Sequence, residues 1–530
     1  MITMMGMPRA DAAVHVASRV EGLAAVPAAE AENLQTLSLS LLIGAAVLII
    51  AIAAVRLSTR SGLPSLLLYL GIGLLLGNRG LGIDFSDEAL TQVLGYAALI
   101  LILTEGGLTT KWQSIRSSLA PAAALATVGV VVSIVVVAVA AHLVLDMPWN
   151  VALLIGAILA STDAAAVFAV LRRVPLPRRV SGMLEAESGF NDAPVVLLVT
   201  AFATRTAEGG GGESWWELGG VVVVELVLGS LVGLAVGWLG GRLMARVAGG
   251  SSALFAIGVV AVSVLAYAAA DVVHASGFIA CYLASLVLGN MGLPHRAAVL
   301  GFSTALGWLA QIGLFVLLGL LADPAGFGSQ VVPALVLGLV LLLLARPLSV
   351  LVSCTPFGLS WRTQAFLSWA GLRGAVPVVL ATVPMTVGAR GVDWVFDLVF
   401  VLVVVFTLVQ APTLPWVARR LGLDQAHHSV DLTLEATPFD DIGAHLLEVT
   451  IGDTSRMAGV QVYELRLPAG ANVALVVREG SSFVPRETTP LRRGDHLLVV
   501  TPAELRGPVE KRLYAVSRAG RLAGWSSPGG

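Results

Sequence analysis

Charged residues within apolar surroundings are concentrated between Ser161 and Asp192. The stretch opens with Ser161-Thr162-Asp163 and closes with Glu187-Ser188-Gly189-Phe190-Asn191-Asp192, and both clusters lie in apolar runs long enough to cross a bilayer. An ionisable side chain in hydrocarbon is costly unless it lines a cavity or has a partner, so it marks a functional site by default. Two such clusters in consecutive runs predict an ion pathway.

The two aspartates are the groups that could carry an ion. Asp163 precedes Arg172 by nine residues and Asp192 follows Arg179 by 13. At 1.5 Å per residue they lie about 14 and 20 Å from the basic edge, near the middle of a bilayer about 30 Å thick. A carboxylate removed from water holds either a proton or a desolvated cation, and the two compete for one site. With alternating access, that competition is sufficient for exchange.

Neutral oxygens stand beside the aspartates in Thr162, Ser188 and Asn191. Oxygen ligands suit a hard cation, and backbone carbonyls of a broken helix could complete the shell. The alternative is that these three side chains only form hydrogen bonds between helices. The residues alone leave both interpretations open for these three side chains, whereas the cost of burying Asp163 and Asp192 favours a role for the two aspartates in binding a monovalent cation.

Glu187 and Arg373 are expected to form a structural ion pair rather than to bind the ion. Arg373 is the only basic residue well inside its apolar run, and a buried charge left without its partner costs about 3–5 kcal/mol. Glu105 and Glu225 also fall within apolar runs, where a position near a helix end or facing a cavity explains a lone acid.

The composition is that of a membrane protein. Of 530 residues, 57% are hydrophobic and 12% charged, about half the charged share of soluble domains. The net charge of −2 argues against a nucleic-acid partner. Cys281 and Cys354 fit neither a disulfide framework nor a metal-ligand spacing.

About 13 apolar runs could form transmembrane helices, near 35–55, 62–79, 89–108, 119–145, 149–171, 181–204, 216–240, 252–272, 275–293, 299–322, 331–352, 362–388 and 393–417. The fifth and twelfth runs would be counterparts in inverted repeats. Interruptions are expected at Gly371–Pro377 in the twelfth run and at Gly189 and Pro194 in the sixth.

Basic residues between these runs predict the orientation. Alternate connections hold 13 Lys and Arg against 3, the first set being Arg56, Arg60, Lys111, Arg116, Arg172, Arg173, Arg178, Arg179, Arg242, Arg246, Arg296, Arg346 and Arg362, and the second Arg79, Arg205 and Arg390. The positive-inside rule places the first set in the cytoplasm. We expect a multi-pass protein of the inner (plasma) membrane with its N-terminus outside and its C-terminus in the cytoplasm.

Beyond Asp424 short alternating stretches replace the apolar runs, at 445–451, 462–467, 473–477 and 496–500. The expected domains are an extracytoplasmic tail (1–34), a transmembrane domain (35–420), a linker (421–439), a small cytosolic α+β domain (440–516) and a disordered tail (517–530). The fold class is an all-α polytopic membrane protein carrying that small domain.

Four motifs in the apolar runs resemble those of the monovalent cation:proton antiporter family. Ser161-Thr162-Asp163, Glu187–Asp192, Gly371-Leu372-Arg373-Gly374 and Glu105-Gly106-Gly107-Leu108 carry the resemblance, which covers roughly residues 35–420. Leu465–Pro468 and Leu491–Asp495, with Val477-Arg478 and Val484–Arg486, resemble the TrkA-C domain, without the glycine-rich nucleotide-binding half.

The resemblance implies inverted repeats in which the fifth and twelfth runs cross as partly unwound helices. It implies that Asp192 carries cation and proton, that Asp163, Thr162 and Ser188 complete the site, and that Asn191 marks electroneutral members. A homodimer, a small-molecule or nucleotide effector at the TrkA-C domain and no cofactor are expected. Potassium is favoured over sodium.

Two other functions deserve comparison with potassium or sodium exchange. A gated cation channel fits the TrkA-C resemblance but lacks a filter such as Thr-Val-Gly-Tyr-Gly. An intramembrane hydrolase could use paired aspartates, yet the chain lacks a glycine-aspartate motif beside them and a zinc motif of the His-Glu-x-x-His type. We therefore expect a transporter and not an enzyme.

Overall fold

The computed structural model describes residues 28–523 except 62–63, 84, 172–173, 175, 210–213, 248–250, 390, 425–431, 440–443 and 453–454. Most of the expected N-terminal tail, Arg172, Arg173, Arg390 and the last seven residues therefore lie outside the described residues. The chain divides into two units, Met1–Ser61, which contains helix α2 (Ala28–Ser61), and Gly62–Gly530.

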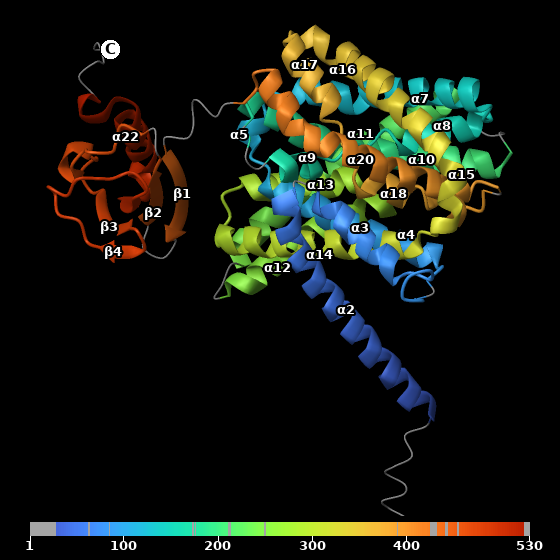
Figure 1. Cartoon of the computed structure of the whole chain (residues 1–530), viewed down its shortest axis with the longest axis horizontal. Helices are drawn as coiled ribbons and strands as arrows, with labels where there is room; N and C mark the ends of the chain where they lie inside the picture. The colour runs from blue at the N-terminus through green and yellow to red at the C-terminus, as the bar shows by residue number, and fades with distance from the viewer. Residues whose placement is uncertain are drawn as a thin grey trace, which may run out of the picture. The chain divides into compact units, whose positions relative to one another are not determined.

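Residues 64–423, here called the membrane domain, consist of helices joined by connections (Figure 1). They are α3 (Ser65–Leu76), α4 (Glu88–Thr109), α5 (Trp112–Ile115), α6 (Leu119–Ala124), α7 (Val130–Leu145), α8 (Trp149–Ile158), α9 (Ala164–Leu171), α10 (Arg178–Ala207), α11 (Trp215–Val247), α12 (Ser252–Val272), α13 (Gly277–Asn290), α14 (Arg296–Leu321), α15 (Pro324–Val340), α16 (Arg346–Cys354), α17 (Trp361–Trp369), α18 (Ala375–Leu380), α19 (Val383–Thr386) and α20 (Trp394–Arg420).

Eight helices of the described chain are long and apolar enough to cross a membrane, and four more are apolar but shorter. A helix or an interrupted run of helices occupies the place of each predicted run. The chain is thus a mostly helical integral membrane protein, while the count of 13 crossings stays a prediction.

Two apolar runs are broken where the chain crosses itself. The fifth run divides into α8 and α9 around an extended stretch at Ser161–Asp163, and the twelfth divides into α17 and α18 around Gly371–Gly374. The Asp163 backbone N–H donates to the Leu372 carbonyl at 2.9 Å, so the two extended stretches are in contact. The crossing predicted from the family resemblance is confirmed. The break predicted in the sixth run is wrong, because α10 continues through Pro194.

The membrane domain has two groups of helices. Helices α3, α4 and α11–α14 pack on one another, as do α6–α10 with α15–α20, and α10, α18 and α19 contact the first group. Within the first group, α11 lies against α13 through Gly229, Gly233 and Gly237, where an added Cβ would meet the α13 backbone. Small residues four apart let two membrane helices approach this closely.

A repeated irregularity relates the two halves of the domain. Two π-helical segments, η1 (Leu125–Gly129) and η2 (Leu341–Ala345), begin 216 residues apart (341 − 125). Ser133 and Ser349, also 216 apart, lie four residues beyond the two segments, and their buried hydroxyls are 2.7 Å apart. The equal offsets agree with the predicted internal repeats. Arg346 directly follows η2, and π segments are frequent beside functional residues.

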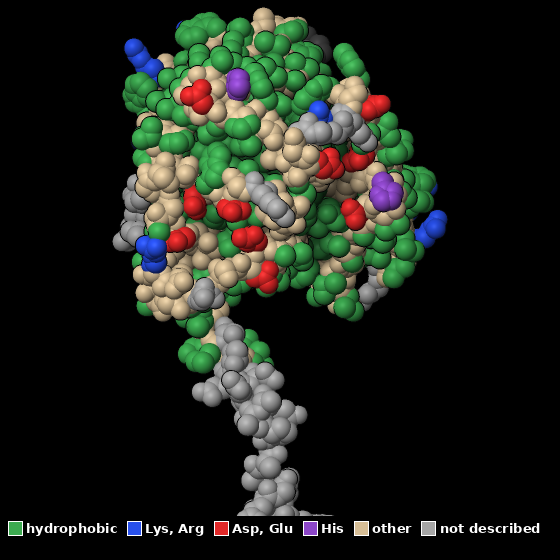
Figure 2. All heavy atoms as spheres, turned by 90° about the vertical axis from the view of Figure 1, so that its right-hand side faces the viewer, with side chains coloured by type: hydrophobic (Ala, Val, Ile, Leu, Met, Phe, Trp, Pro, Cys, Tyr) green, Lys and Arg blue, Asp and Glu red, His purple; other side chains and the backbone are tan. Residues whose placement is uncertain are grey.

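The charged side chains on one face of the membrane domain are mainly acidic (Figure 2). Figure 2 shows more acidic than basic side chains on the face that lies to the right in Figure 1. Asp87 caps α4 and Asp323 caps α15, and Asp323 pairs with exposed Arg79 at 2.9 Å.

Arg346, assigned above to a cytoplasmic connection, is instead buried, with 5% of its surface exposed. Without Arg346, the count of Lys and Arg in the two sets of connections becomes 12 against 3.

The C-terminal domain is a five-stranded antiparallel sheet in the order β1-β2-β5-β3-β4, with helix α22 (Arg506–Ala519) packed on it. The strands are β1 (Leu432–Phe439), β2 (Ala444–Ile451), β3 (Asn472–Arg478), β4 (Ser481–Phe483) and β5 (His496–Pro502). Leu447, Val499 and Leu513 are among its fully buried core residues.

Three expectations for this domain need correction. Strand β1 falls in the predicted linker, and α22 extends three residues into the predicted disordered tail. The stretch 462–467 contains a 3-10 turn (Val462–Leu465) rather than a strand, because Gln461 and Glu464 form a capping box.

Buried Asp495 accepts two hydrogen bonds from Arg478, at 2.8 and 2.7 Å, and these raise the pKa of Arg478. Arg478 therefore stays charged across the physiological pH range.

Candidate functional site

The site lies where the extended stretch Ser161–Asp163 meets helix α10. A cavity of about 310 Å³ opens there, and both aspartates line it together with Thr162 and Ser188. This volume could hold roughly ten water molecules, so an ion could enter with part of its hydration shell. Four of the five predicted ion-site residues thus share one cavity.

The two aspartates are held by different donors. Asp192, 8% exposed, accepts a 2.7 Å hydrogen bond from the Ser161 hydroxyl. Asp163 begins α9, and its Oδ1 accepts from the backbone N–H groups of Ala165 and Ala166 at 2.9 and 3.2 Å. A carboxylate is a favourable acceptor at a helix N-terminus, so these two donors hold the Asp163 side chain in place at the crossing.

Gly374 gives Asp163 its space. A Cβ at this position would overlap the Asp163 carboxylate. The extended segment of the twelfth run therefore requires glycine at the point where it passes the fifth. This contact explains in steric terms why the Gly371-Leu372-Arg373-Gly374 motif accompanies the Ser-Thr-Asp motif.

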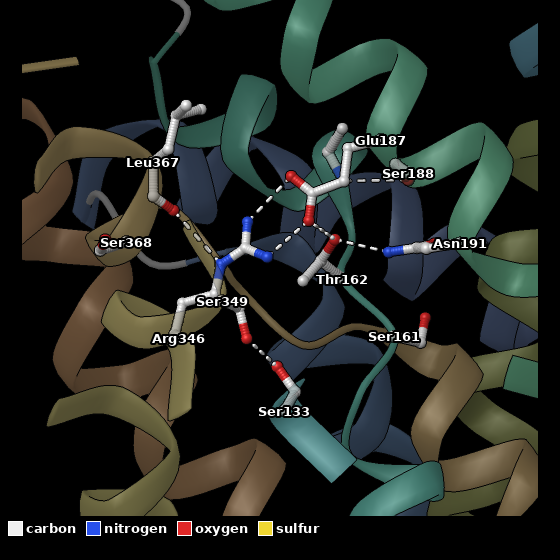
Figure 3. A network of polar contacts seen from close by, with 12 residues as sticks. Ser133, Ser161, Thr162, Glu187, Ser188, Asn191, Arg346, Ser349, Leu367 and Ser368 are labelled. Carbon is white, nitrogen blue, oxygen red and sulfur yellow. Dashed lines mark hydrogen bonds and ion pairs between the residues drawn. The ribbon is translucent and has the colours of Figure 1, made fainter. Parts of the chain in front are cut away.

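A buried network stands behind the cavity (Figure 3). Arg346 donates to both carboxylate oxygens of Glu187, at 2.6 and 2.8 Å, and their side chains are 6% and 3% exposed. The Thr162 hydroxyl donates to Glu187 at 3.0 Å and accepts from the Asn191 amide at 2.7 Å. Asn191 does not line the cavity, and its Oδ1 has no hydrogen-bond partner in the described chain.

The expected ion pair of Glu187 with Arg373 is therefore wrong: Arg346 is the partner of Glu187. Arg373, 3% exposed, donates instead to the carbonyls of Leu159 and Gly371, at 2.9 and 2.7 Å. Both carbonyls belong to interrupted helices, which leave backbone acceptors without the usual intrahelical donors. Arg373 thus stabilises the crossing, and Arg346 neutralises the carboxylate.

Sequence reasoning missed several residues of the site. Ser161 and Arg346 contact site carboxylates, and Glu185 and Tyr282 line the cavity. Glu105 also lines the cavity, which is one of the two positions expected for it. Ser161 had a visible signal, since it directly precedes Thr162 in the predicted cluster. Arg346 had none, because a residue inside an apolar run and one at its edge look alike in a sequence. The described residues contain no group of three or more His, Cys, Asp or Glu that could hold a metal ion.

Comparisons with known proteins agree with this geometry. Residues 45–420 match the family model "Sodium/hydrogen exchanger, transmembrane", and residues 446–506 match the TrkA-C domain. The chain is 37% identical over 478 residues to the K(+)/H(+) antiporter NhaP of Alkalimonas amylolytica, covering 88% of this chain and 82% of that protein. It is 35% identical over 469 residues to NhaP2 of Shewanella oneidensis, a K(+)/H(+) antiporter, covering 87% and 80% of the two chains.

A solved structure shares the fold. The sodium proton antiporter MjNhaP1 from Methanocaldococcus jannaschii superposes with a TM-score of 0.64 at 21% identity, covering 73% of this chain and 99% of that one. At this identity the likeness concerns the fold alone.

Proposed function

The chain belongs to the sodium/hydrogen exchanger family, and from that premise we propose that this cation/proton antiporter exchanges potassium for protons at Asp192. The observation that carries the proposal is that Asp192 and Asp163 line one cavity at the crossing of two interrupted helices. Broken helices near the middle of a membrane are where secondary transporters bind their ions. Asp163, Thr162 and Ser188 add oxygen ligands, and Asn191 acts through its hydrogen bond to Thr162.

The proposed cycle is electroneutral. Asp192 carries one proton in one direction and one cation in the other, so no net charge crosses the membrane per cycle. A membrane potential, worth about 2.3 kcal/mol per charge per 100 mV, then leaves the exchange equilibrium unchanged. Potassium is favoured by the two relatives named as K(+)/H(+) antiporters and by the TrkA-C domain. Sodium as the main substrate is the second candidate, favoured by the match to the sodium/hydrogen exchanger family model.

The proposal extends to the surroundings of the protein. We assign it to the inner (plasma) membrane as a homodimer, with the basic connections and the C-terminus in the cytoplasm. The cavity reaches exposed Thr109 at the end of α4, one residue before the connection that carries Lys111. On this assignment the described conformation faces the cytoplasm. The TrkA-C domain would then meet a small-molecule or nucleotide effector in the cytosol.

The test is cation-induced dissipation of a pH gradient in proteoliposomes, with potassium, sodium and lithium added separately. The wild type is compared with Asp192→Asn, which keeps the side-chain volume and removes the charge. Potassium-evoked proton movement that the variant lacks is the expected result. A response to sodium or lithium alone would replace potassium by sodium, and equal activity of Asp192→Asn would refute the assignment of the carrier. For the stoichiometry, a membrane potential is imposed by a method that uses neither potassium nor valinomycin. A change in the exchange equilibrium under that potential would refute 1:1 exchange.

A further inference from the structure

Two polar side chains on the wall of the cavity have no hydrogen-bond or ion-pair partner among the residues that the structure describes. The Tyr282 hydroxyl is fully buried, in a residue 2% exposed, and has no hydrogen-bond partner there. The Glu185 carboxylate is half-buried on the same wall, and Lys111 is close enough to act on it electrostatically without forming an ion pair. A buried polar group without a partner calls for an explanation, and an ion that occupies the site only at times is one.

Both groups lie on the route from the open end of the cavity to Asp192. Glu185, Ser188 and Asp192 are spaced three and four residues apart on α10, so they follow one face of that helix. Seven residues of helix place Glu185 about 10 Å from Asp192 along the axis, toward the basic end of α10. Thr110 also lines the cavity, and its side chain lies beside the Tyr282 hydroxyl without forming a hydrogen bond of normal geometry. Glu185 is close enough to Tyr282 to act on it electrostatically.

The position of Tyr282 is fixed by close packing. Its ring occupies the space where Gly189 would carry a side chain, and it meets the Phe190 ring edge-on at 5.5 Å between centroids. Tyr282 belongs to α13, which is packed tightly against the glycines of α11. Tyr282 therefore lines the cavity from the helix group opposite α10, so an ion that enters between the two groups passes beside it.

From these positions we propose that Glu185, Tyr282 and Thr110 form a second, transient station for the monovalent cation, between the open end of the cavity and Asp192. The inference rests on the proposed function, since it adds a stage to the same pathway. One carboxylate and two hydroxyls offer oxygen ligands of the kind a hard cation accepts. Lys111 opposes tight binding, which suits a station that must release the ion inward.

The transport test uses full-length protein in proteoliposomes and measures the apparent KM for potassium and sodium. Glu185→Gln removes the charge and keeps the volume, Glu185→Asp keeps the charge, and Tyr282→Phe removes only the hydroxyl. Glu208→Gln, an exposed acid at the far end of α10, and Tyr267→Phe, a tyrosine of α12 that does not line the cavity, are the matched controls.

We expect Glu185→Gln to raise the apparent KM about three- to tenfold, because a charged cleft of low dielectric concentrates counter-ions, with the maximal rate kept within about twofold. Glu185→Asp should recover most of the affinity, and Tyr282→Phe should raise KM about two- to threefold. Added choline chloride should screen the Glu185 charge and so reduce the difference in apparent KM between wild type and Glu185→Gln. A purely structural defect would leave that difference unchanged. An unchanged KM in monodisperse Glu185→Gln overturns the station.

A binding measurement separates this inference from the proposed function. Radioactive rubidium is titrated against the purified full chain in detergent, with Asp192→Asn and the double variant Asp192→Asn/Glu185→Gln. Asp192→Asn should keep saturable but weaker rubidium binding, and the double variant should lose it. Equal binding by the two variants refutes the station. If wild-type liposomes exchange no cation, the proposed function fails, while the rubidium titration still decides whether the station exists.

Discussion

Replacing Arg346 by leucine should destabilise the protein strongly. The change leaves the Glu187 carboxylate, 3% exposed, with the single hydrogen bond from Thr162 in place of three. Stranding one member of a buried ion pair costs about 3–5 kcal/mol, because the remaining charge keeps its desolvation penalty and loses its counter-charge. Replacing both partners by apolar residues should recover much of this loss, since a buried pair seldom stabilises more than the hydrophobic residues that could fill its place.

The assay is the fraction of full-length protein that stays monodisperse in detergent after heating, supported by denaturant midpoints for each variant. Arg79→Leu is the control, because it removes an arginine from the exposed pair with Asp323, whose side chains are 61% and 62% exposed. Solvent screening limits such a pair to about 0–1 kcal/mol. The heating midpoint of Arg346→Leu should therefore fall well below that of the control.

A double-mutant cycle tells whether the partner of Glu187 is the one described here. Glu187→Met combined with Arg346→Leu should give a coupling of about 2 kcal/mol or more, and Glu187→Met combined with Arg373→Leu about 1 kcal/mol or less. Arg373→Leu will still destabilise the protein, because it leaves the carbonyls of Leu159 and Gly371 without their donor. A larger coupling with Arg373 would refute the network, as would an Arg346→Leu variant that is as stable as the control.

Three further substitutions test other contacts. Gly374→Ala places a methyl group on the Asp163 carboxylate, so we expect exchange to be lost in proteoliposomes while size-exclusion profiles stay normal; full activity would contradict the steric argument. Ser161→Ala removes the donor to Asp192 and should raise the apparent KM for the cation about fivefold, equivalent to about 1 kcal/mol, with an unchanged KM as the opposing result. Asp495→Asn removes the acceptor charge in the C-terminal domain and should cost about 2–3 kcal/mol, seen as faster limited proteolysis of that domain; proteolysis at the wild-type rate would mean that the pair is dispensable.

The fold was predictable because its signals are local. A hydrophobic run of bilayer length predicts a helix almost regardless of its neighbours, and the glycines around Arg373 marked the break in the twelfth run. Pro194 misled the same reasoning, since a proline in a membrane helix can be accommodated when neighbouring groups satisfy the freed carbonyl. The break in the fifth run carries neither glycine nor proline, so only the family resemblance predicted it.

The site was predictable in its residue types but not in its pairings. Charge and polarity singled out Asp163, Asp192 and Glu187, because such residues are rare in apolar runs. The partner of Glu187 depends on the packing that brings Arg346 within reach of its carboxylate, and on carbonyls elsewhere that engage Arg373. Both sets of contacts are tertiary contacts between helices that are far apart in the sequence. A pattern of residue types therefore identifies which charges are buried before it can say how they are neutralised.

The charges around the crossing give an independent reason to expect one cation per proton. Three carboxylates, Asp163, Asp192 and Glu187, stand with two guanidinium groups, Arg346 and Arg373, so this cluster has a net charge of −1 when fully ionised (3 − 2). Glu105 and Glu185 also line the cavity, but they are only half-buried, so water screens their charges more. Burying a net charge is costly, and either one proton or one monovalent cation removes it. Two bound cations would leave an excess of +1 in the same low-dielectric surroundings. If exchange is 1:1 as proposed, the two arginines account for it by leaving one negative charge to be balanced, and replacing Arg373 by a neutral residue should favour binding of a second cation.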